Sequence, residues 1–297
     1  MRPMNCLFLA ALAAPCVAGS SAAPAQETTV ASSTNADAAA GAYRLLDSDR
    51  PRFTQRPYTV DPGGFQLELG FLDITSDDDF DTLKFLPLLL KIGLTESMDF
   101  EIGFEPYVDF DPDPGDDDDG IGDTTLRLKI NLWRNDAAAA AVSGAGGGAG
   151  GGGGKGLMDG DALALIPFIR LPTGSGDIGA QEVEGGVLVP WSAPLNETID
   201  LGVMFGVDFV HDEADDSYDT ELISSGALDF ELQEDLSVYT ELIGVFTTDA
   251  GHDHRALLGG GVMFALNPGA VLDAGVAIGL NDEAEDFRFT TGITVRF

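Results

Sequence analysis

From residue 65 onward the chain is a series of runs, each about ten residues long, in which apolar and polar side chains alternate. In the first run Phe65, Leu67 and Leu69 share one face, and Gln66 and Glu68 share the other. A period of two indicates β-strands with one apolar and one polar face. We expect twelve strands, near residues 65–74, 82–94, 98–110, 123–133, 162–172, 183–191, 199–210, 219–232, 236–247, 255–266, 270–280 and 287–297.

The length of these runs and the charges on their polar faces separate two all-β architectures. Strands of soluble β-sandwiches average about five or six residues, whereas strands of about ten residues can cross a bilayer when tilted. Full charges mixed with glycine suit a wet, crowded barrel lumen. We therefore predict one transmembrane antiparallel up-and-down β-barrel of about twelve strands. Its lumen-lining residues would be Glu68, Glu101, Glu105, Arg127, Lys129, Arg170, Asp200, Asp208, Glu221, Glu231, Glu241, Arg255, Asp273, Arg288 and Arg296.

The connections between the expected strands alternate between short and long. Residues 95–97, 233–235 and 267–269 are tight turns, and transmembrane barrels have short periplasmic turns and longer outer loops. The longer connections contain 23 acidic residues and no Lys or Arg, so we expect a strongly acidic outer rim. These connections are residues 76–81, 111–123, 173–181, 211–219, 248–254 and 281–286.

The amino-terminal part of the chain divides into two segments. Arg2, an apolar run over residues 6–18 and a small-x-small site at residues 23–25 predict a secretory signal peptide over residues 1–25. Residues 26–64 are expected to form a flexible periplasmic segment, followed by the barrel over residues 65–297. An Ala/Gly-rich insert occupies residues 137–156 of the barrel. Both cysteines lie in the signal peptide, so the exported chain would have no disulfide.

Composition and motifs exclude other functions. The chain has 15 Lys and Arg against 50 Asp and Glu among 297 residues, a net charge of −35 and a pI near 4.1, so nucleic acid is not an expected partner. His211, His252 and His254 are not accompanied by a nucleophile motif. We therefore expect no enzyme, no catalytic residue and no organic cofactor.

The densest acidic loop raises the question of a metal site. Asp116, Asp117, Asp118 and Asp119 lack the alternating acids of an EF-hand, because Gly115 occupies one of the required positions. Two interpretations stay open at this point. The four carboxylates are either a solvated charged rim or a loose site for Ca²⁺ or Mg²⁺.

Several short blocks stand out along the chain: residues 50–54 (RPRFT), 57–60 (PYTV), 63–68 (GGFQLE), 93–95 (GLT), 122–129 (GDTTLRLK), 171–174 (LPTG) and 184–186 (EGG). Together they resemble a known family, the phenol meta-pathway degradation family of outer-membrane transporters. The likeness extends from about residue 50 to residue 297, and the block at residues 122–129 is its most specific part. It implies an outer-membrane β-barrel linked to uptake of aromatic or other small organic compounds.

Two functions from different classes follow. The first is a channel in the outer membrane of a Gram-negative-type bacterium for passive uptake of small organic solutes, including aromatic or hydrophobic ones. The second is a structural or surface-interaction barrel with a plugged lumen and cation-binding acidic loops. The expected partners are outer-membrane lipid, the small organic solute and the barrel-assembly machinery, which would recognise the amphipathic last strand ending in Phe297.

Overall fold

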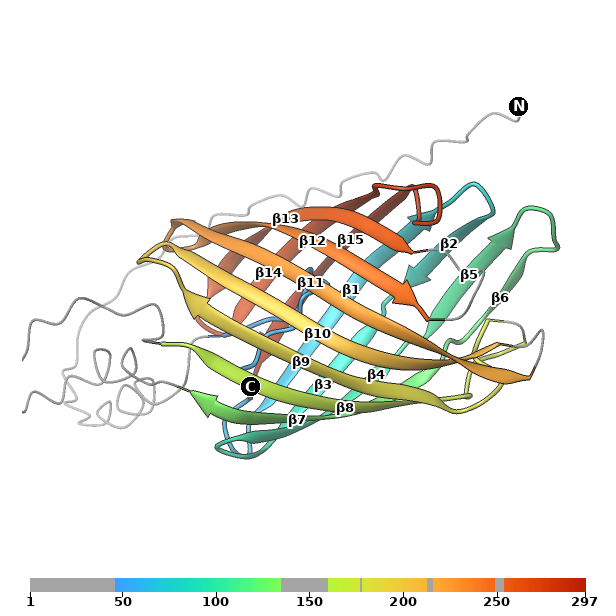
Figure 1. Cartoon of the computed structure of the whole chain (residues 1–297). Helices are drawn as coiled ribbons and strands as arrows, with labels where there is room; N and C mark the ends of the chain where they lie inside the picture. Colours follow the sequence, from blue (N-terminus) through green and yellow to red (C-terminus); the bar gives the residue numbers. More distant parts are fainter. Residues whose placement is uncertain (1–45, 135–159, 177, 213–215, 249–253) are drawn as a thin grey trace, which may run out of the picture. The chain divides into compact units, whose positions relative to one another are not determined.

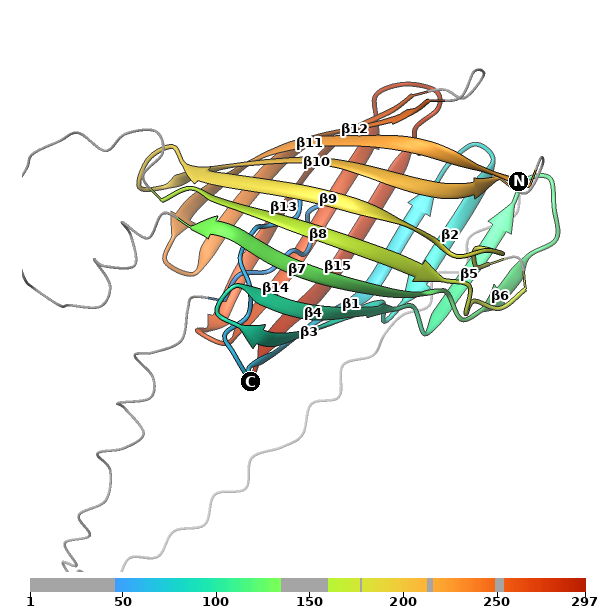
Figure 2. The same ribbon diagram turned by 60° about the horizontal axis from the view of Figure 1, so that its bottom comes forward.

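The computed structural model describes residues 46–134, 160–176, 178–212, 216–248 and 254–297 (Figure 1). Pairing between its first and last strands closes an antiparallel sheet into a barrel (Figures 1 and 2). The expected signal peptide, residues 26–45 and the Ala/Gly-rich insert lie outside the described residues. The strands are β1 (Phe65–Ser76), β2 (Phe80–Phe85), β3 (Leu88–Thr95), β4 (Met98–Phe104), β5 (Tyr107–Pro112), β6 (Asp118–Gly120), β7 (Thr124–Arg134), β8 (Ala162–Leu171), β9 (Glu184–Pro194), β10 (Ile199–Asp212), β11 (Ser217–Gln233), β12 (Leu236–Thr247), β13 (Arg255–Asn267), β14 (Ala270–Gly279) and β15 (Phe287–Arg296).

Three of the barrel's strands are each interrupted once. β2 and β3 pair with β1 in one continuous register and are separated by two residues, the second of which is Pro87. β4 and β5 likewise form one interrupted strand, and so do β6 and β7. Pro106 lies in the gap between β4 and β5. Proline cannot donate a ladder hydrogen bond, which explains two of the breaks. Counted through these gaps, the barrel has twelve strands, and the predicted fold is confirmed.

Connection lengths alternate as the sequence predicted. At one end, two-residue turns join β3 to β4, β11 to β12 and β13 to β14. At the other end lie longer loops such as residues 172–183 and 280–286. β10 and β11 are longer than expected, so their connection shortens to residues 213–216.

Burial on the barrel is the reverse of that in a soluble protein. Large apolar side chains such as Phe205 and Leu242 are exposed on the outside, whereas Lys129 and Glu101 have no exposed surface. A wall that exposes apolar groups and hides charges fits a lipid exterior and a polar interior. In the described part of the chain, no helix is long and apolar enough to span a membrane.

Residues 46–64, which we call the plug, run inside the barrel (Figures 1 and 2). Their hydrogen bonds reach strands around the whole wall, from Asp99 on β4 to Glu241 on β12 and Thr294 on β15. Expecting a flexible periplasmic segment was therefore wrong for residues 46–64. The physical reason is that the polar groups of the plug satisfy buried polar groups of the wall.

The plug enters β1 through a tight contact with β3. Gly63 donates a hydrogen bond to the Gly93 carbonyl (2.8 Å), and the Gly93 amide donates to the Gly64 carbonyl (3.0 Å). A Cβ atom at Gly93 would lie 1.9 Å from the carbonyl oxygen of Asp61. Glycine is therefore the only residue that fits at position 93 without displacing the plug backbone.

We predict that Gly93→Ala destabilises the barrel by about 1–3 kcal/mol, the usual cost of an overpacked site. The temperature at which the folded band converts to the unfolded band on gels measures the effect. Gly226→Ala on β11 is the matched control, because the nearest atom to its added Cβ is 3.9 Å away. Equal melting of the two variants would contradict the assigned contact.

Candidate functional site

One group of charges anchors the start of the plug to β1, β3, β4 and β7. The Asp49 carboxylate accepts hydrogen bonds from the ammonium groups of Lys91 and Lys129, the second at 2.8 Å. Lys91 also pairs with Glu68 at 2.6 Å, and Lys129 pairs with Glu101 at 3.2 Å. All five side chains are almost completely buried.

The ionisation of Asp49 depends on these two lysines. Burial by itself raises the pKa of a carboxyl group. In Asp49, the ammonium groups of Lys129 and Lys91 outweigh the burial and hold the pKa well below its ordinary value. Asp49 is therefore a fixed negative charge of the plug, and it neutralises part of the positive charge of both wall lysines.

A second group of contacts holds the middle of the plug against β11 and β12. Arg52 and Arg56 both pair with Asp229, Arg56 at 3.1 Å. The Glu241 carboxylate accepts hydrogen bonds from the Phe53 and Thr54 amides at 2.9 and 3.0 Å. The plug is thus fastened to opposite parts of the wall by charge-assisted hydrogen bonds, the stronger kind.

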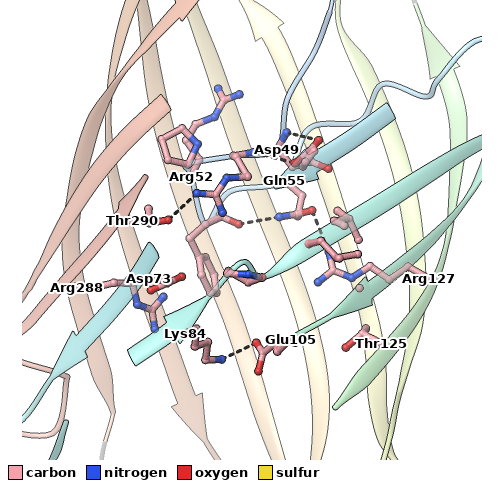
Figure 3. Close-up of a pocket in the computed structure, with 18 of the residues that line it drawn as sticks. Asp49, Arg52, Gln55, Asp73, Lys84, Glu105, Thr125, Arg127, Arg288 and Thr290 are labelled. Atoms are coloured by element: carbon pink, nitrogen blue, oxygen red, sulfur yellow. Dashed lines mark hydrogen bonds and ion pairs between the residues drawn. The ribbon is translucent and has the colours of Figure 1, made fainter. Parts of the chain in front are cut away.

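A cavity of about 810 Å³ lies in the lumen on the long-loop side of the plug (Figure 3). Plug residues from Asp49 to Phe53, together with Gln55, form its floor. Charged side chains line one part of its wall, among them Lys84, Arg127 and Arg288 (Figure 3). The size is within the range of small-molecule sites in proteins.

Another part of the cavity wall is apolar. Ile166, Leu188 and Met204 form a buried cluster, and Phe53 and Phe168 pack against it. Of these, Leu188, Met204 and both phenylalanines border the cavity. The lumen therefore offers a solute an apolar surface in addition to charges.

The loop after β8 contributes Ile178, Gly179 and Ala180 to the lining of the cavity, and Asp123 holds it in place. Asp123 Oδ1 accepts hydrogen bonds from the Thr173 and Gly174 amides, at 3.0 and 2.8 Å. Its Oδ2 accepts one from Ala180 at 2.7 Å. The Thr124 amide also binds this loop, since it donates a hydrogen bond to Thr173 Oγ1 at 2.9 Å. The sequence blocks GDTT and LPTG therefore contact each other in the folded chain.

The residues predicted to line the lumen fall into four groups. Glu68, Glu105, Arg127, Arg170, Glu241 and Arg288 border the cavity. Glu101, Lys129 and Asp273 contact the plug or its partners, and Arg296 hydrogen-bonds Gln66 at 2.8 Å. Asp208 pairs with Arg170 and Glu221 with Arg255, while Asp200 is half-buried on β10. Glu231 is exposed beside the turn that follows β11, on the same strand face as Asp229, and its place in the lumen stays a prediction.

The sequence reasoning missed several residues of the site. Lys91 was left out because apolar side chains on both faces of residues 82–94 hid the alternation. The plug arginines were missed because residues 46–64 have no period. A usable signal existed, since Arg50, Arg52 and Arg56 place three of 15 basic residues within seven positions of a strongly acidic chain.

Residues Asp116–Asp119 do not form a preformed metal site. Within the described ranges, no three His, Asp or Glu side chains are grouped so as to hold a metal ion. Asp118 and Asp119 belong to β6 and pair in register with Phe110 and Asp109. Loose Ca²⁺ or Mg²⁺ binding at this loop stays a prediction.

Comparison with known proteins agrees with this geometry. The family model described as "Putative MetA-pathway of phenol degradation" matches residues 48–297, which include nearly all of the plug. No curated protein matches the sequence. Among solved structures, a COG4313 outer membrane channel from Pseudomonas putida F1 is 13% identical with a TM-score of 0.57, covering 81% of this chain and 98% of that one. The NanC porin is 8% identical with a TM-score of 0.51, covering 78% and 98%. These likenesses show the outer-membrane barrel fold.

We predict that Lys129→Met loosens the plug, because it leaves Glu101 buried without its cation. Breaking such a buried pair costs about 3–5 kcal/mol. The population of the loosened state should therefore rise about a hundredfold or more. Trypsin cleavage after Arg52 measures that population, since Arg50 and Arg56 each precede proline.

The matched control for this substitution is Lys84→Met. Lys84 and Glu105 form a pair at 2.6 Å in which both side chains are about one third exposed, so its loss costs about 0–1 kcal/mol. Tryptic cleavage at Arg52 that is equally fast in both variants would refute the role assigned to Lys129.

Proposed function

This chain belongs to the MetA-pathway phenol-degradation family, and from that premise we propose that it is an outer-membrane channel for passive entry of small organic solutes, including aromatic or hydrophobic ones. The observation that carries the proposal is the cavity above the plug. It is closed laterally by the barrel wall, is about 810 Å³ in volume and has an apolar part formed by Phe53, Phe168 and Leu188. An apolar surface inside a lumen is of no use for water or simple ions.

The plug is the gate of this channel. Lys129, Glu68 and Gln66 are fully buried against it, so the short-turn half of the lumen is filled. A solute in the cavity continues toward the periplasm when the plug shifts or leaves. Charge pairs are suited to this role, because they hold one position firmly and are broken without strain in the wall.

A structural barrel with a permanently plugged lumen is the competing function. It explains the buried charges equally well, but it gives no reason for a large cavity with an apolar wall. We propose further that the protein is not an enzyme. Of the histidines in the described ranges, His211 places Nε2 3.2 Å from the exposed Asp216, and its Nδ1 has no partner, so no base oriented by a buried acid is formed there.

We predict that a disulfide between plug and wall closes the channel. Thr54 Oγ1 and Ser225 Oγ are 2.9 Å apart and both residues are buried, so cysteines at these two positions are placed to bond. No cysteine occurs after residue 16, so the engineered pair would be unique. Swelling of liposomes in arabinose, a small organic solute that lipid retains, should be abolished by oxidation and restored by reduction.

Each single-cysteine variant serves as the control, and its swelling should not respond to the redox state. Swelling that is absent in the native, oxidised and reduced proteins alike would favour the structural barrel. Swelling that persists with the disulfide formed would show that solutes pass without movement of the plug.

A further inference from the structure

We propose that the cavity binds a solute with one carboxylate and an apolar body, with Arg127 as the carboxylate's partner. The inference rests on the proposed function in one respect, namely that solutes enter this cavity. Arg127 lies on β7, and its side chain reaches the cavity from the wall (Figure 3).

Arg127 differs from the other cations around the cavity. Arg50, Arg52, Lys84, Arg170 and Arg288 each have a carboxylate within 4 Å. In the described part of the chain, Arg127 has no such ion pair. Its hydrogen bond goes to the neutral side chain of Gln55, with Nη1 3.4 Å from Oε1. Arg127 Nε is buried without an acceptor, as are those of Arg50, Arg52 and Arg288, so the missing ion pair is what sets Arg127 apart.

The neighbouring acid does not pair with Arg127. Glu101 lies opposite Arg127 in the register of β4 and β7, but its ion pair is with Lys129. Arg127 is half-buried, and a partly desolvated guanidinium with unused donors is stabilised when an anion reaches it. A guanidinium group binds a carboxylate by charge-assisted, often paired, hydrogen bonds, and Arg127 borders the cavity from which such a ligand would approach.

The apolar body has a surface beside this guanidinium. Phe168 on β8 lies directly opposite Arg127 in the register, so both side chains are on the inner face. Phe53 of the plug packs against the same cluster as Phe168, and Leu188 continues it along the wall. A flat or short apolar group with its carboxylate on Arg127 therefore lies over aromatic and aliphatic side chains.

The surrounding charges limit the solute to a single negative charge. Asp73 also borders the cavity, and no ion pair neutralises it in the described structure. The stretches that the sequence predicts as outer connections carry 23 acidic residues and no Lys or Arg, and repulsion from them grows with the charge of the solute. Dianions and phosphorylated compounds are therefore disfavoured, whereas a monocarboxylate is balanced by Arg127.

The test is calorimetric titration of the full-length barrel in detergent at neutral pH, with empty micelles as the blank. Benzoate is the probe, benzamide is its neutral analogue of the same shape, and phthalate is the dianion. We expect the native protein to bind benzoate at least tenfold more tightly than benzamide or phthalate. This ligand series needs no variant, so it decides the matter even if a substitution impairs folding.

Arg127→Gln should weaken benzoate binding at least tenfold and leave benzamide binding unchanged. Arg255→Gln is the matched control. Arg255 pairs with Glu221 at a distance of 2.6 Å and does not border the cavity, so this variant should bind benzoate like the native protein. Equal benzoate binding by native and Arg127→Gln protein, or equal affinity for benzoate and benzamide, overturns the proposal. Liposome swelling that depends on the plug would still support the channel in that case, whereas its absence would refute the channel itself.

Discussion

Neutralisation of charge inside the barrel is the constraint on which the rest of this structure depends. The wall turns Glu68, Asp229 and Glu241 away from lipid into a space that the chain itself fills. Buried charges persist when they are paired and hydrogen-bonded. The plug supplies the missing partners, with arginines for the acids of β11 and β14 and Asp49 for the lysines of β3 and β7. Its position then fixes the floor of the cavity.

The barrel could be predicted from the sequence because its signal is local and repeated. Alternation along each strand follows from the pleat and does not depend on what the strand pairs with. The continuous register through the gaps at Pro87 and Pro106 explains why an interrupted strand still reads as one run. The acidic loops were predictable for the same reason, since their composition changes at each strand end.

The plug and the lining of the cavity could not be predicted in this way. Arg52 is 177 residues from Asp229 in the chain, and a segment without a period gives no sign of such a partner. The rule that polar faces point inward also fails locally. Ile166 and Met204 are buried inside the barrel, because they pack against each other and against Phe53 of the plug. That part of the site depends on packing between distant segments.

The junction between plug and wall has a consequence for assembly. The plug continues directly into β1, and Phe65 at its start exchanges backbone hydrogen bonds with Phe297 at 3.0 and 2.9 Å, where the first and last strands close the cylinder. A cylinder that closed around an empty lumen would enclose Lys91 and Lys129 without Asp49, and Asp229 without its arginines. Filling by the plug therefore stabilises the closed cylinder. The segment that fills the finished barrel also makes it favourable for the nascent sheet to close.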